Sequence, residues 1–166
     1  MRLSSLLFFC LLILISCQEP VDEKIDTSWS ILYKQVLEPN CSNCHMNGSA
    51  IQKQSGLDLS SSAAYDALVG VTPKNSAAIN DGLLRVSTEG GMKGLTQSYL
   101  WEKINVYDQE HFLNDHPDYG QLMPPGGNVL TDGELQFVRS WIEAGAPESG
   151  IVVDEGLLLN TDRYTP

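Results

Sequence analysis

Basic residues are scarce in this chain of 166 residues, which has 10 Lys and Arg against 21 Asp and Glu and a formal net charge of −11 at pH 7. A surface that binds nucleic acid needs clustered positive charge, so this balance argues against a nucleic-acid partner. An acidic surface favours solubility and can steer a basic partner protein. Apolar residues still make up 42% of the chain, and its length fits a single domain with one core.

The chain also lacks an apolar run long enough to span a bilayer. The run from Leu6 to Ile15 follows Arg2 and ends just before Cys17, which is typical of an export signal peptide. The letters "LISC" resemble the lipobox of bacterial lipoproteins, whose cysteine is lipidated and becomes the first residue of the mature protein. We therefore expect residues 1–16 to be a signal peptide of the lipoprotein type, Cys17 to be lipidated and residues 17–27 to form a lipidated tether. In the alternative, an ordinary cleaved signal contains an incidental cysteine.

The residue after the expected lipidation site is Gln18. It is not the aspartate that retains some Gram-negative lipoproteins at the inner membrane. We therefore expect an exported protein that is lipid-anchored in the cell envelope, at the outer membrane, and faces the periplasm or the cell surface.

Cysteine is sparse as well, because Cys10 and Cys17 belong to the expected signal and anchor and only two others remain. Cys41 and Cys44 precede His45 in a CxxCH motif, the attachment signature of c-type haem. Residues three apart lie on one face of a helical turn, so both thiols can join one edge of the macrocycle. His45 projects about 100° further round, towards the iron. The motif predicts that Cys41 and Cys44 bind one haem c covalently and that His45 is the proximal iron ligand.

Two other chemistries use paired cysteines. A zinc site would need two further ligands, but the chain has no second CxxC and no HxxxH, and His111 and His116 are five residues apart. A thioredoxin-like CxxC lies at a strand-to-helix junction, which this helix-rich sequence does not offer. Export also favours haem, because c-type haem is attached outside the cytoplasm.

The second axial position of the iron separates an electron carrier from a haem protein that binds small ligands. Met123 is the predicted distal ligand, because the prolines of "GQLMPPGG" stiffen the turn that presents its sulfur and the glycines let the backbone turn away. Met46 adjoins His45 and cannot reach the opposite face, and Met92 lies in a flexible glycine-rich stretch. The competing side chains are Met46, Met92, His111 and His116.

Apolar residues recur at helical spacing from Trp29 to Val36, from Tyr99 to Ile104 and from Leu135 to Ile142. The first helix is expected to begin after Thr27 or Ser28 and to stop at Pro39. A shorter one should follow a cap at Ser61 or Ser62, and the last should begin with a capping box of Thr131 and Glu134. Polar stretches rich in glycine and proline predict loops over residues 47–56, 71–82 and 109–130. The sequence has no evident strand and no internal repeat, so we predict an all-α protein.

The order of these features resembles a class I cytochrome c domain, of the kind found in bacterial lipoproteins and in larger planctomycete-type proteins. The resemblance rests on the first amphipathic helix, "CSNCH", "LMPPGG" and "LTDGELQFVRSWIEAGAP". It covers residues 28–147 and leaves residues 148–166 as a C-terminal tail. It implies a cytochrome c fold in which the N- and C-terminal helices cross around a covalently bound haem with long loops. It also implies that Cys41 and Cys44 hold the haem, with His45 proximal and Met123 distal.

One feature departs from the family pattern. In many class I cytochromes a proline carbonyl soon after the motif orients the proximal imidazole, whereas here the first proline after His45 is Pro73. The acceptor that orients His45 is therefore not assigned by the resemblance. The candidates to contact the haem propionates, by chemistry alone, are Arg85, Lys103, Trp101 and Tyr99.

These features predict an electron-transfer protein of the cell envelope that exchanges electrons with redox partner proteins and converts no substrate. An alternative is a haem enzyme or sensor whose labile distal ligand leaves to admit peroxide or a gas. A third possibility is a haem-containing module tethered for the assembly of a larger envelope complex.

Overall fold

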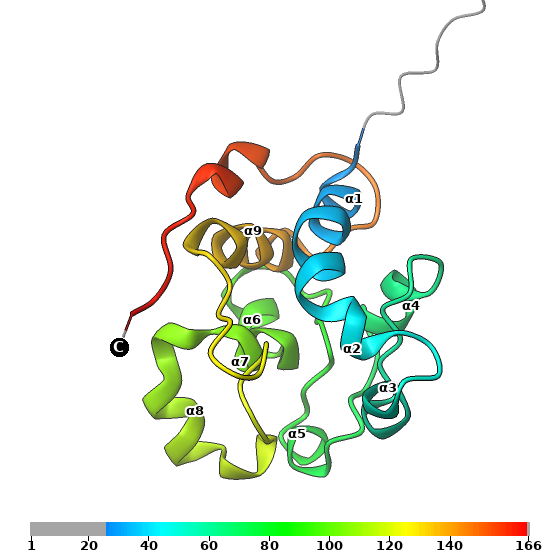
Figure 1. Cartoon of the computed structure of the whole chain (residues 1–166), viewed down its shortest axis with the longest axis vertical. Helices are drawn as coiled ribbons and strands as arrows, with labels where there is room; N and C mark the ends of the chain where they lie inside the picture. The colour runs from blue at the N-terminus through cyan, green and yellow to red at the C-terminus, as the bar shows by residue number, and fades with distance from the viewer. Residues whose placement is uncertain (1–25, 166) are drawn as a thin grey trace, which may run out of the picture.

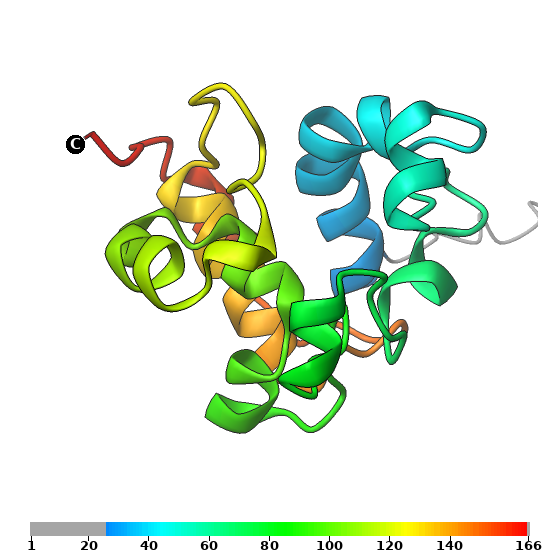
Figure 2. The ribbon, with the colours of Figure 1, turned by 90° about the horizontal axis from the view of Figure 1, so that it is seen from below.

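The computed structural model describes residues 26–165, which fold into a predominantly helical protein (Figures 1 and 2). Within these residues there is no β-sheet, although three isolated β-bridges form, and the predicted all-α class is confirmed. The α-helices are α1 (Ser28–Leu32), α2 (Asn43–His45), α3 (Ala50–Ser55), α4 (Ala64–Leu68), α5 (Ser76–Asn80), α6 (Gly91–Thr96), α7 (Tyr99–Ile104), α8 (Gln109–Asp115) and α9 (Asp132–Glu143). The π-helix η1 (Tyr33–Ser42) joins α1 to α2, and the 3-10 helices are η2 (Val106–Asp108), η3 (Pro117–Tyr119) and η4 (Glu155–Leu159).

The first and last α-helices begin at caps that the sequence predicted. The Thr27 side chain accepts a hydrogen bond from the Ser30 amide at 3.1 Å at the start of α1. At the start of α9 the Glu134 amide donates to the Thr131 hydroxyl at 3.1 Å, and the Thr131 amide donates to the Glu134 carboxylate at 2.7 Å. This reciprocal pair confirms the capping box.

The two terminal helices pack against each other (Figure 1). The ring of Trp29 on α1 lies 5.5 Å from that of Trp141 on α9, which is fully buried. A hydrogen bond also joins η1 to α9, since the Asn40 side chain donates to the Glu134 carboxylate at 3.0 Å. The main core forms between these helices, and both Cys41 and Met123 pack on its edge as partly buried side chains.

The expected stop at Pro39 is wrong, because the chain continues as helix through Ser42 and directly into α2. Proline removes one backbone donor from a helix interior, and wide π-turns accommodate such an interruption. A side chain compensates nearby, because Asn40 donates to the Val36 carbonyl at 2.8 Å. The Ser42 hydroxyl also lies 3.3 Å from the Leu37 carbonyl.

The three stretches predicted as loops contain short helices, namely α3, α5 and α8. Two of them start at local side-chain caps, because Ser49 accepts from the Gln52 amide and Asn75 from the Ala78 amide. Helices of one or two turns are too short to produce a clear apolar period, which explains the error. The predicted cap of α4 is also wrong, since its N-cap is Ala63 and forms no side-chain hydrogen bond.

Residues 148–165 run back across the helices rather than away from them (Figure 1). The η4 segment packs on α9, where the Gly133 amide donates to the Asn160 carbonyl at 3.1 Å. At the other end of this segment the buried Ser28 hydroxyl accepts from the amides of Val152 at 2.8 Å and Val153 at 3.0 Å. The C-terminal segment therefore bridges both terminal helices.

Candidate functional site

The CxxCH motif lies at the end of one continuous helical run formed by α1, η1 and α2. Cys41 is in the last turn of η1, and Cys44 and His45 are in α2. The Ser42 hydroxyl between the cysteines is also 3.0 Å from the Leu59 carbonyl, and the Leu59 amide donates to the His45 carbonyl at 2.7 Å. The segment that follows the motif therefore fixes its backbone.

The two cysteines are free thiols in different surroundings: Cys41 is half-buried and Cys44 is exposed. Burial, followed by the charge of Glu134 and the neighbouring Cys44, raises the pKa of Cys41 from its ordinary value of 9.0 to about 12. The Cys41 thiol is therefore protonated at neutral pH. A thioredoxin-like redox pair instead depends on a thiol whose pKa is lowered, so this environment disfavours that chemistry.

The imidazole of His45 is half-buried, and its Nδ1 lies 3.3 Å from the Ser55 hydroxyl. That hydroxyl donates its proton to the Ile51 carbonyl at 2.8 Å, so it can only accept from His45. The proton of the neutral ring then sits on Nδ1, and Nε2 keeps its lone pair. Burial lowers the pKa of His45 and the charge of Arg85 lowers it further, against a backbone hydrogen bond at Leu57 that raises it. His45 is therefore a neutral imidazole with Nε2 available to a metal.

The sequence did not identify the group that accepts a hydrogen bond from the imidazole of His45. Ser55 and the backbone at Leu57 interact with the imidazole, and neither is a proline. No motif marks them in the sequence, because they reach His45 through the turn that ends α3, where Gly56 adopts a left-handed conformation with φ of 70°. Only the spacing of ten residues between His45 and Ser55 hints at such a return.

Arg85 is the buried cation closest to this part of the structure, with 8% of its surface exposed. Its guanidinium donates to the Ala67 carbonyl at 2.6 Å and to the Ser55 carbonyl at 3.2 Å. Among residues 26–165 it forms no ion pair with a carboxylate. Burial lowers its pKa, but a guanidinium remains charged at any ordinary pH. A positive charge is thus held beside His45 without an acidic partner.

The other propionate candidates lie elsewhere. Tyr99 and Lys103 both donate to the Tyr119 carbonyl, at 2.6 Å and 2.9 Å, beside a second and smaller apolar cluster. Burial lowers the pKa of Lys103 to about 8. Trp101 packs on the main core. Arg85 is therefore the candidate that the structure brings to His45.

Met123 is half-buried on the main core, and its amide donates to the Lys103 carbonyl at 2.6 Å. Its peptide bond to Pro124 is cis. Residues 124 and 127–129 of this loop line a common hollow with Pro39 and Asn40, which directly precede Cys41. The methionine loop and the end of η1 therefore line the same hollow, and Figure 2 shows the yellow loop facing the blue helical run across a gap.

The competing distal candidates differ from Met123 in their surroundings. Met46 is 51% exposed and Met92 is 60% exposed. His111 and His116 lie together on α8 and at its C-terminal cap, with their rings 4.9 Å apart. Within the described residues, Met123 is thus the one methionine that packs on the core shared with Cys41.

The predicted signal peptide, the predicted lipidation site Cys17 and most of the predicted tether fall before residue 26, outside the described residues. In the part of the chain from residue 26 to 165, no helix is both long and apolar enough to cross a membrane.

No protein-family model, no curated protein and no solved structure matches this chain. A function can therefore be inferred only from its residues and their contacts.

Proposed function

We propose that this chain is an electron-transfer protein of the cell envelope that carries one covalently attached haem c. The observation that carries the proposal is the CxxCH motif on one helical run, with a neutral His45 whose Nε2 is free to bind a metal. Bound there, haem would supply a one-electron Fe(III)/Fe(II) couple.

The surroundings of the two cysteines fit covalent attachment. Cys41 is a protonated thiol at the edge of the apolar core, where an apolar macrocycle edge would gain burial, and Cys44 is exposed one turn further on. Within residues 26–165, the one group of three or more metal-ligating side chains that converge does not include Cys41, Cys44 or His45. That arrangement suits a haem clip better than a zinc site, whose ligands must surround one point.

His45 would be the proximal iron ligand through Nε2, since Ser55 holds the proton on Nδ1. A hydrogen bond to the second ring nitrogen orients a metal-bound imidazole and fixes its tautomer. Arg85 would face a haem propionate, because it carries a buried positive charge without a carboxylate partner in the described chain. A buried charge is most stable when it is paired.

Met123 would be the distal ligand, and the fold would be that of a class I cytochrome c. Support comes from the packing of α1 on α9 through Trp29 and Trp141, and from the methionine loop beside the end of η1. Two permanent axial ligands leave no site for a substrate, so the protein would act as a carrier for redox partner proteins. Lipidated Cys17 and the tether would hold it at the outer membrane.

Covalent haem is tested first. The pyridine haemochrome spectrum of the exported protein should report one haem c per chain, and Cys41→Ser together with Cys44→Ser should abolish covalent attachment. A wild-type protein that is exported with the haem-assembly machinery present and still carries no haem would overturn the proposal.

The distal ligand is tested by Met123→Ala, with Met92→Ala as a matched control on an exposed methionine. Met123→Ala should convert the iron from low-spin to high-spin, lower the reduction potential and allow rapid CO binding, whereas Met92→Ala should change none of these. A wild-type protein that already binds CO readily would favour the enzyme or sensor reading instead.

A further inference from the structure

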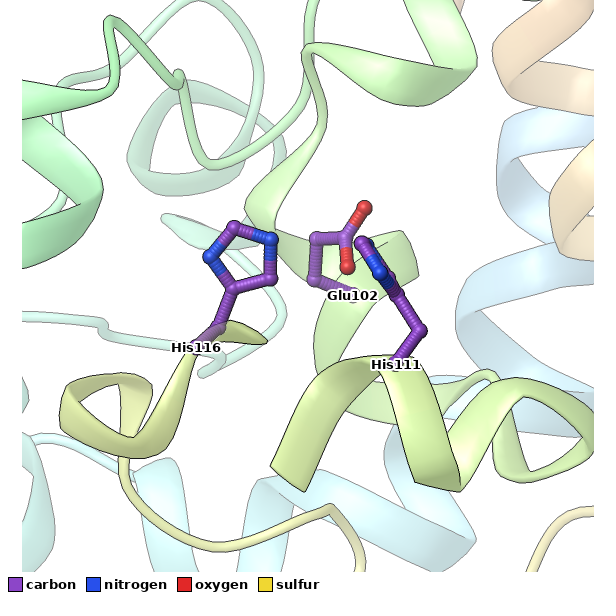
Figure 3. Close-up of side chains that lie close together, drawn as sticks. All are labelled: Glu102, His111 and His116. Atoms are coloured by element: carbon purple, nitrogen blue, oxygen red, sulfur yellow. The ribbon is translucent and has the colours of Figure 1, made fainter. Parts of the chain in front are cut away.

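A second group of potential metal ligands lies away from the CxxCH motif. Glu102 on α7, His111 on α8 and His116 at the C-cap of α8 each offer one ligand atom, and these atoms all lie within 4.8 Å of one another. Figure 3 shows the Glu102 side chain between the two imidazole rings. Glu102 and His116 are half-buried, while His111 is exposed and open to an incoming ion.

The end of α8 explains how two histidines five residues apart come together. In a continuous helix their side chains would diverge by about 140°, because each residue turns the chain by about 100°. At His116 the backbone leaves helical geometry, with φ of −128° and ψ of 51°, and Pro117 then begins η3. This break turns His116 back towards His111, and their rings meet nearly edge to face, with centroids 4.9 Å apart and planes at 83°.

Each imidazole also has a carboxylate at its Nδ1. His111 Nδ1 lies 2.8 Å from the Asp115 carboxylate, and His116 Nδ1 lies 3.9 Å from that of Asp81. Metal-binding histidines commonly donate their second ring N–H to a carboxylate, which leaves the other nitrogen for the ion. Nε2 of His111 is therefore the nitrogen that remains for an ion, and the His116 nitrogen on the side of the ring away from Asp81 faces Glu102 (Figure 3). His116 is further held by stacking on Tyr119, with ring centroids 4.3 Å apart.

The carboxylate of Glu102 completes the set. It is half-buried beside two imidazoles, and within residues 26–165 it forms no hydrogen bond or ion pair with another side chain. Two ligand atoms of a tetrahedral zinc ion are about 3.3 Å apart, so closing the site requires side-chain shifts of about 1.5 Å at most. His111, with 43% of its side chain exposed, has room to make that adjustment.

We propose that Glu102, His111 and His116 bind a divalent transition-metal ion such as Zn²⁺, through two imidazole nitrogens and one carboxylate oxygen. Two histidines and one carboxylate are a recurrent ligand set for Zn²⁺ and Fe²⁺, and they leave a coordination position open to water or to another ligand. Asp115 is a positioning residue that orients His111, and Tyr119, whose hydroxyl donates to Asp81 at 2.7 Å, orients His116 by stacking. The site is separate from the proposed haem ligands, but it shares α7 with the carbonyl of Lys103, which anchors the Met123 amide.

The proposal is tested with Zn²⁺ alone, titrated calorimetrically into the chelator-treated, full-length exported protein. We expect one Zn²⁺ per chain. Glu102→Gln, His111→Gln and His116→Gln should each weaken binding at least tenfold, and Asp115→Asn about tenfold through its effect on His111. The matched control is Glu110→Gln, which removes the same charge from an exposed position on α8 and should change the affinity less than threefold.

A second measurement needs no variant. On adding Zn²⁺, the ¹⁵N resonances of Nε2 in His111 and His116 should shift, and those of His45 should not. The proposal is overturned if the wild-type protein binds no Zn²⁺. It is equally overturned if binding survives in the His111→Gln variant and disappears instead when Cys41 and Cys44 are replaced, because the thiols would then be the ligands.

Discussion

Ser28 offers a quantitative test of how the C-terminal segment is attached. Its hydroxyl is fully buried at the start of α1 and accepts hydrogen bonds from two amides, those of Val152 and Val153. Replacing Ser28 by alanine leaves both amides without this acceptor. Val153 is 5% exposed, so its amide stays unsatisfied, whereas Val152 is 44% exposed and its amide can turn to water.

The cost follows from these exposures. An unsatisfied buried donor costs about 1–3 kcal/mol, and an ordinary hydrogen bond exchanged for water about 0.5–1.5 kcal/mol. We therefore expect Ser28→Ala to lower the free energy of unfolding by about 1.5–4.5 kcal/mol, as measured by urea denaturation. Because alanine also favours the helix slightly, the observed loss should lie in the lower half of that range.

Ser30→Ala is the control, since Ser30 lies two residues further along α1 and, among the residues from 26 to 165, its hydroxyl forms hydrogen bonds with Thr27 and Asp26 only. That change should cost less than about 0.5 kcal/mol. If Ser28→Ala costs less than about 1 kcal/mol, or no more than Ser30→Ala, the attachment of the C-terminal segment through the Ser28 hydroxyl is refuted.

Two further predictions concern packing and pH. A Cβ at Gly133 would lie 2.6 Å from the Asn160 carbonyl oxygen and still closer to that of Leu157, so Gly133→Ala should detach η4, lower stability by about 1–3 kcal/mol and speed amide exchange there. Gly94→Ala, where the nearest atoms are 3.6 Å away, should cost less than about 1 kcal/mol, and equal effects would contradict the reasoning. Burial raises the pKa of Tyr99 from 10.0 to about 12. The folded state is therefore favoured by the protonated phenol of Tyr99; this contribution to stability is complete below pH 10 and is lost as the pH rises through 12. Denaturation series should show that Tyr99→Phe flattens this alkaline decline, by up to about 1.4 kcal/mol per pH unit; parallel curves for both proteins would refute it.

The sequence predicted those features that depend on local patterns. The capping box of Thr131 and Glu134 and the N-cap at Thr27 are local hydrogen bonds between residues three apart, and both form as expected. The CxxCH motif is local too, so its position on a helical turn could be anticipated. The attachment of haem to it stays a prediction.

The sequence was least informative where distant or unusual contacts decide the structure. Pro39 was expected to end a helix, but the helix continues past it, and the Asn40 side chain supplies a hydrogen bond to the Val36 carbonyl. The partners of His45 come from a turn ten residues away, without a motif. A continuous helix would keep the side chains of His111 and His116 apart, but α8 ends between them and their rings lie 4.9 Å apart.

The continuous run of α1, η1 and α2 also sets an orientation. It begins at Ser28, just after the proposed tether, and reaches Cys41 thirteen residues later. At no more than about 1.5 Å per residue, the run spans at most about 20 Å. If Cys17 is anchored and haem is bound at Cys41 and Cys44 as proposed, the tether would meet one end of this helical run and the haem would lie at the other end. This helical run would therefore act as a spacer between the membrane and the face for electron exchange. A partner protein in solution could then reach that face.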